Sequence, residues 1–181
     1  MVGEIKSALE LAIEKSEKYV ISDEERERIR EKEILQKVTG LFHRYKEGRL
    51  SQSEMMREIE KMDEKVRERV KEALFSRWTD DLSLDSDPER PFDAMESLKG
   101  RSLNDIRKKF ESLRSVYRNE IEGARQTLSL EIVKVLKDEG IGGEAVEPNV
   151  EGSEKWKGRI EEVNRSHQER LKEIKGALKR L

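Results

Sequence analysis

The hydrophobic residues of this chain recur every three or four positions, which is the spacing of one face of an α-helix. The series is short in residues 4–19 and longest in residues 103–138, where ten apolar positions follow one another in this period. A second long series runs from Trp156 to Leu181. The pattern predicts an all-α protein of long amphipathic helices in antiparallel hairpins, an elongated bundle with coiled-coil-like packing.

Two capping boxes, each a serine with a glutamate three residues later, mark helix starts in the N-terminal half. They predict helices over residues 23–47 and 52–77. The link between these helices is short and contains Gly48, so we expect an antiparallel hairpin. Its turn should bring together apolar side chains from both helices. These side chains are Phe42, Tyr45, Met55 and Ile59.

Residues 79–101 interrupt the helical pattern. They hold two of the three prolines and five aspartates, and both residue types are disfavoured inside helices. We expect an acidic linker with at most one short helix, near residues 91–98, and no regular structure over residues 79–90. The linker would separate an N-terminal helical region, residues 1–78, from a long C-terminal helical hairpin, residues 102–181.

The two longest apolar series predict that hairpin. Ser153 can cap a helix over residues 154–181, which would run back along the helix over residues 103–138. The loop between them, residues 140–153, is longer than the roughly two to eight residues common between bundle helices. This loop is either a connector folded back onto the end of the hairpin or a surface that contacts a partner.

Three apolar residues of the long helix lie beside its main stripe. They are Val116, Leu130 and Val133, and a single antiparallel neighbour cannot cover them. Either the N-terminal region folds over these residues or a second copy of the chain does. Two-fold homodimers are the commonest assemblies. We therefore expect a homo-oligomer, with a dimer favoured, or an unidentified protein partner.

The composition is typical of thin helices rather than of a thick core. Charged residues make up 43% and hydrophobic residues 34% of the 181 positions, whereas about 25% and 45–50% are usual. The sequence has no cysteine, which excludes disulfides and thiolate chemistry. Charges interrupt the first apolar residues, and no apolar run approaches the ~20 residues of a membrane span. We expect a cytoplasmic protein without a secretory signal.

The net charge of −2 is unevenly distributed. Residues 79–97 hold seven acidic residues and one basic residue, whereas residues 98–118 hold seven basic and two acidic residues. The acidic segment could dock on the basic segment, for example through Arg107. The basic segment is also the best candidate for binding nucleic acid. However, its adjacent cations point in different directions around a helix, and no aromatic residues alternate with them.

Known catalytic and metal-binding motifs are missing from the sequence. Neither His43 nor His167 follows a glutamate at the spacing used in di-iron bundles, and the aspartates of residues 80–93 do not form an EF-hand loop. There is no phosphate-binding glycine loop and no nucleophile motif. We predict no catalytic residue, cofactor or metal. His167 lies on an apolar stripe, which favours a buried polar role over a ligand or a pH switch.

Two segments resemble parts of a family of short bacterial proteins known only as a domain of unknown function. They are residues 3–12 (GEIKSALELA) and residues 140–149 (GIGGEAVEPN), the latter followed by Trp156. The resemblance covers only these segments closely. It implies a bacterial cytoplasmic protein, and it carries no activity, cofactor or catalytic residue to this chain.

These observations favour a non-enzymatic structural or protein–protein interaction protein, which self-associates or docks the helices of a partner. The alternatives are a nucleic-acid-associated protein that uses residues 98–118 and an enzyme without a recognisable motif. The candidate interaction surface combines the apolar face of the first helix with the glycine-rich loop and the start of the last helix. Its residues are Ile5, Leu9, Ile13, Val146, Pro148, Asn149 and Trp156.

Overall fold

The structure is a computed structural model that describes residues 22–143 and 147–181. Within these residues the chain forms six helices and no strand, so the protein is all-α, as predicted. The helices are α2 (Asp23–Lys46), α3 (Gln52–Glu60), α4 (Glu64–Asp81), α5 (Glu89–Lys99), α6 (Asn104–Asp138) and α7 (Glu154–Lys179). The helix predicted over residues 4–19 lies outside the described residues.

The predicted helix starts after Ser22, Ser51 and Ser153 are confirmed. Each serine Oγ accepts a hydrogen bond from a backbone N–H in the first turn of its helix. At Ser51 the capping box is complete, because the Glu54 carboxylate accepts a hydrogen bond from the Ser51 N–H in return. Gly48 has a φ of 74°, the left-handed conformation that glycine adopts where a helix ends.

The single helix predicted over residues 52–77 is wrong, because the chain breaks after Glu60 and resumes as α4 at Glu64. No glycine or proline marks this break. Its one sequence signal is Asp63, a residue type favoured at helix N-caps. The break allows α3 to pack on both α4 and α5, while α4 becomes the main neighbour of α2. The four side chains expected at the turn, Phe42, Tyr45, Met55 and Ile59, are all buried.

Residues 79–101 differ from the expected linker. Helix α4 continues to Asp81, residues 82–88 form no helix, as expected, and the short helix expected near residues 91–98 is α5, which is part of the core. The buried side chains of α5 are Pro91, Phe92, Ala94, Met95 and Leu98. Their spacing forms one apolar face, and the proline lies in the first turn, where it breaks no helical hydrogen bond. The burial of this face outweighs the polar residues around it.

One continuous core joins the six helices of the described chain. At its centre Trp78 of α4 is fully buried. Its ring centroid lies 4.4 Å from that of Phe42 and 5.6 Å from that of Tyr45, both on α2. On the other side of the core, Phe92 of α5 meets Phe110 of α6 at 5.7 Å between ring centroids. Helix α6 is therefore attached to the core near its N-terminal end.

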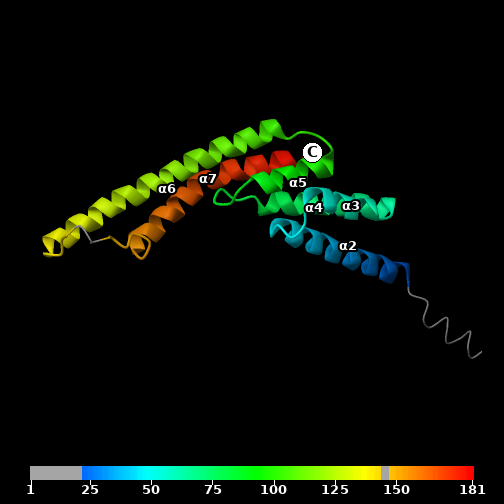
Figure 1. Cartoon of the computed structure of the whole chain (residues 1–181), viewed down its shortest axis with the longest axis horizontal. Helices are drawn as coiled ribbons and strands as arrows, with labels where there is room; N and C mark the ends of the chain where they lie inside the picture. Colours follow the sequence, from blue (N-terminus) through cyan, green and yellow to red (C-terminus); the bar gives the residue numbers. More distant parts are fainter. Residues whose placement is uncertain (1–21, 144–146) are drawn as a thin grey trace, which may run out of the picture.

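Helices α6 and α7 pack along each other and run in opposite directions (Figure 1). The C-terminal end of α7 packs against α4, with Leu178 fully buried in the core and Lys179 pairing with Asp80 at 2.7 Å on the surface. The opposite end of the pair projects away from α2 to α5 (Figure 1). We call this projecting part, residues 116–138 with residues 154–167, the α6–α7 arm.

Candidate interaction surface

The structure places only part of the interaction surface that the sequence predicts. Four of its seven residues, Ile5, Leu9, Ile13 and Val146, lie outside the described residues. Of the other three, Pro148 and Trp156 are half-buried and Asn149 is exposed.

The described end of the glycine-rich loop is a compact turn that leads into α7. The Gly152 N–H donates a 3.0 Å hydrogen bond to Asn149 Oδ1, and the Ser153 hydroxyl donates one of 2.8 Å to the Val150 carbonyl oxygen. The Val150 side chain is buried. The side chains at this end of the loop therefore satisfy local groups, which is the geometry expected of a connector.

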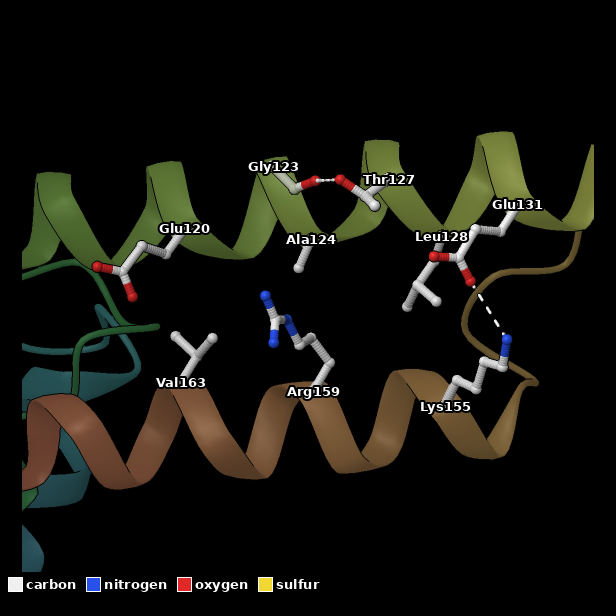
Figure 2. Close-up of a pocket in the computed structure, with 9 residues that line it drawn as sticks. All are labelled: Glu120, Gly123, Ala124, Thr127, Leu128, Glu131, Lys155, Arg159 and Val163. Carbon is white, nitrogen blue, oxygen red and sulfur yellow. Dashed lines mark hydrogen bonds and ion pairs between the residues drawn. The ribbon is translucent and has the colours of Figure 1, made fainter.

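A groove of about 720 Å³ lies between the two helices of the arm. Figure 2 shows its lining residues. The floor is apolar and includes Ala124, Leu128 and Val163, whereas Gly123 and Thr127 line it from α6. Because Gly123 and Ala124 are small, they leave space that larger residues would fill. The groove is therefore an incompletely filled seam between two long helices.

Acidic and basic side chains face each other across this groove. Glu120 and Glu131 lie on α6, and Lys155 and Arg159 lie on α7. Glu131 pairs with Lys155 at 3.2 Å, while the Arg159 side chain extends between the helices (Figure 2). Exposed pairs of this kind contribute only about 0–1 kcal/mol. These charges can therefore be rearranged at little cost when another molecule approaches.

Next to the groove, an exposed face of α6 carries no charge over five helical turns. We call this face the outer stripe; its residues are Ser112, Val116, Asn119, Gly123, Thr127 and Leu130, all exposed. Val116 is 42% exposed and Leu130 is 72% exposed. Neither the N-terminal helices nor α7 covers them in the described part of the chain. The sequence predicts that another helix or a second copy covers Val116, Leu130 and Val133. In the described chain nothing covers Val116 and Leu130, whereas Val133 is half-buried.

A polar network around the buried Tyr117 lies where the loop between α4 and α5 meets α6 and α7, and its other members, Asp85 and Asn164, are exposed. Tyr117 Oη lies 2.8 Å from Asp85 Oδ1 and 2.9 Å from the side-chain oxygen of Asn164. A phenol has one hydrogen, so Tyr117 donates to the carboxylate and accepts from Asn164 when that amide presents its NH₂ group. Burial, followed by the hydrogen bond to Asp85, raises the pKa of Tyr117 to about 12. The network fixes the base of the arm.

His167 of α7 lies beside this network and is only 3% exposed. Its Nε2 is 3.0 Å from Glu120 Oε2, and its ring packs edge-on against Tyr117 at 5.6 Å between centroids. Its Nδ1 has no hydrogen-bond partner among the described residues. The prediction of a buried polar position for His167 is confirmed. Across residues 22–143 and 147–181, no group of three or more His, Asp or Glu side chains could hold a metal ion.

The basic segment, residues 98–118, is partly neutralised within the chain. Arg107 Nη2 lies 2.5 Å from Asp93 Oδ1 and 3.6 Å from Glu96 Oε2, both on α5. The Arg107 guanidinium also lies 5.4 Å from the centre of the Phe92 ring. Docking of the acidic segment on the basic segment, the alternative to a solvated linker, is therefore observed at Arg107.

Sequence reasoning found part of this surface and missed the rest. Val116 and Leu130 are identified by helical periodicity, but Gly123 is not, although it lies seven residues from each. The network around Tyr117 is also missed. Its partners Asp85 and Asn164 lie 32 and 47 residues away, so no local pattern reveals them.

Comparison with protein-family models, with curated proteins and with solved structures found no match. The resemblance of residues 3–12 and 140–149 to a bacterial domain of unknown function therefore stays a prediction. None of the described helices is both long enough and apolar enough to cross a membrane.

Proposed function

We propose that this protein is a non-enzymatic interaction protein that docks helices on the α6–α7 arm. The outer stripe of α6 carries the proposal. It is exposed and uncharged, although 43% of the chain is charged, and it borders a groove with an apolar floor. Depletion of charge around exposed apolar anchors is typical of the centre of protein interfaces. The length of the stripe matches a helical partner, which meets such a face at intervals of three and four residues.

The alternatives have weaker support. Nucleic-acid binding would rely on residues 98–118, where Arg107 is already paired with Asp93 and Glu96. An enzyme would need convergent polar groups in a pocket, whereas the groove on the arm is lined by paired surface charges and small residues. The resemblance of residues 3–12 to bacterial proteins supports placing this function in a bacterial cytoplasm.

Photo-crosslinking from the outer stripe tests this proposal. A benzoylphenylalanine placed at Leu130 should form adducts with a helical segment of another polypeptide chain in the cells that produce the protein. The matched control is the same group at Leu35 of α2, which is 65% exposed but lies away from the arm. Mass spectrometry of the adducts identifies the crosslinked peptide.

Adducts that form at Leu130 and not at Leu35 would support docking on the arm. Equal labelling from both positions would show that the outer stripe has no special affinity for polypeptides. Equal labelling, or no adduct at all, would overturn the proposed function.

A further inference from the structure

From Val116 to Leu130, the outer stripe of α6 matches its own reversed copy. Val116 lies seven residues before Gly123 and Leu130 lies seven residues after it. Seven residues correspond to nearly two complete turns of helix, so these three positions share one face. Asn119 and Thr127 lie four residues on either side of Gly123 on the same face. Between Val116 and Leu130 the stripe therefore has an apolar residue at each end, uncharged polar residues inside and glycine in the middle, whereas Ser112 lies beyond this symmetric part.

Within the described part of the chain, nothing requires a glycine at position 123. A Cβ added at Gly123 would meet no atom within 4 Å outside its own stretch of helix, among the residues that the structure describes. Its φ is not positive, so the backbone does not require glycine either. A glycine inside a helix costs about 0.5–1 kcal/mol relative to alanine. Close approach of another backbone would explain a glycine at the centre of the stripe.

The charges beside the stripe also suit a second copy. Glu120 lies on the α7 side of the stripe, and Arg159 extends from α7 close to Ala124 (Figure 2). A two-fold axis at Gly123 would gather two Glu120 carboxylates and two Arg159 guanidinium groups on one side of the contact. These four charges cancel one another, and each Arg159 also pairs with Glu162 of its own helix at 2.7 Å. The opposite edge of the stripe carries uncharged Ser115 and Gln126, and Gln126 donates a 3.0 Å hydrogen bond to Glu122, the charged residue next to this edge.

We infer that the helix docked on the arm is α6 of a second copy of this chain, antiparallel and related by a two-fold axis at Gly123. In this dimer Val116 packs against Leu130 of the partner subunit, and Leu130 packs against the partner's Val116. The two helices approach most closely where Gly123 meets the partner's Gly123. The inference rests on the proposed function, because it names the occupant of the same surface.

Sedimentation equilibrium of the purified full-length chain over a wide concentration range tests this dimer. We expect the mass to rise to twice 21.2 kDa as the concentration increases. Leu130→Glu should raise the dissociation constant of the dimer at least tenfold, since it buries a charge at the interface. Leu35→Glu, the control at a comparably exposed leucine of α2, should leave the dissociation constant unchanged.

A second pair of variants tests the central contact. Gly123→Leu should also raise the dissociation constant at least tenfold, because a leucine side chain, unlike the small side chain of a cysteine, is too large for the close approach of the two backbones. Gly158→Leu is its control, since a Cβ at Gly158 of α7 also meets open space. Circular dichroism of every variant checks that the helices remain folded. If one variant unfolds, the other pair still decides the question.

The outcomes separate the inference from the proposed function. A chain that stays at 21.2 kDa at all concentrations would overturn the dimer. Equal effects of Leu130→Glu and Leu35→Glu, or of the two glycine variants, would overturn the interface at Gly123. If the chain is monomeric but Leu130 crosslinks to a different polypeptide, the dimer is overturned and the docking function stands. If it is monomeric and Leu130 forms no specific adduct, both are overturned.

Discussion

At the residue scale, His167 and Tyr117 lie together at the base of the arm but differ in how their polar atoms are satisfied. The hydroxyl of Tyr117 has two partners, whereas Nδ1 of His167 has none among the described residues. Leaving a buried polar atom unpaired costs about 1–3 kcal/mol. The carboxylate of Glu120, which pairs with His167, remains about half-exposed and can be hydrated without it.

We therefore expect His167→Leu to raise the free energy of unfolding by about 1 kcal/mol. The substitution removes the unpaired Nδ1 and keeps an apolar side chain at the contact between α6 and α7. Urea unfolding at neutral pH measures the difference. A loss of stability would mean that the contact of His167 with Glu120 outweighs the unpaired nitrogen.

Tyr117→Phe should lower the free energy of unfolding by about 1–2 kcal/mol at neutral pH, because the hydrogen bond to Asp85 is lost. The folded protein holds the phenol proton up to a pKa of about 12, whereas an unfolded tyrosine releases it near its ordinary pKa of 10.0. The stabilisation is therefore complete below pH 10 and is lost as the pH rises towards 12. Unfolding of both proteins across this range should show their stabilities converging. A constant difference would contradict the assigned pKa.

At the element scale, helical periodicity and capping residues predict most of the fold. The starts of α2, α3 and α7 follow from serine caps, and α6 follows from its long apolar series. The same rules fail where tertiary burial decides. For residues 79–101, the prolines and aspartates predict a linker with at most one short helix. That helix is present as α5, but its apolar face is buried in the core, which the linker prediction did not expect.

Local sequence rules also fail to predict the break between α3 and α4. Met55 and Ile59 of α3 and Val70 and Leu74 of α4 all belong to one core. If α3 and α4 formed one straight helix, either Met55 and Ile59 or Val70 and Leu74 would lie outside that core. The chain therefore bends at residues 61–63. Asp63 permits the bend, but an aspartate among many charged residues is too weak a signal to predict it.

At the scale of the whole molecule, the core and the arm differ in what the sequence can predict. The sequence predicts the core through the apolar faces of its helices, which pack against other helices of the same chain. On the arm, the sequence predicts that Val116 and Leu130 need a cover, and the structure shows that α2 to α5 and α7 leave both exposed. The role of Gly123 can be inferred only from the structure, where a Cβ added at this position would meet no atom of another element within 4 Å among the described residues. A sequence pattern cannot distinguish a glycine that ends a helix from one that admits a neighbour.

Cysteine crosslinking tests the central claim, that α6 pairs with α6 of a second copy about Gly123, most directly. The chain has no cysteine, so every crosslink reports an introduced pair. Under mild oxidation, Gly123→Cys should form a disulfide-linked dimer, because this position lies on the two-fold axis and a disulfide requires Cα atoms within about 7 Å. Val116→Cys alone and Leu130→Cys alone should stay unlinked, whereas a mixture of the two should link. Crosslinking of Val116→Cys with itself, or an unlinked Gly123→Cys, would contradict this account.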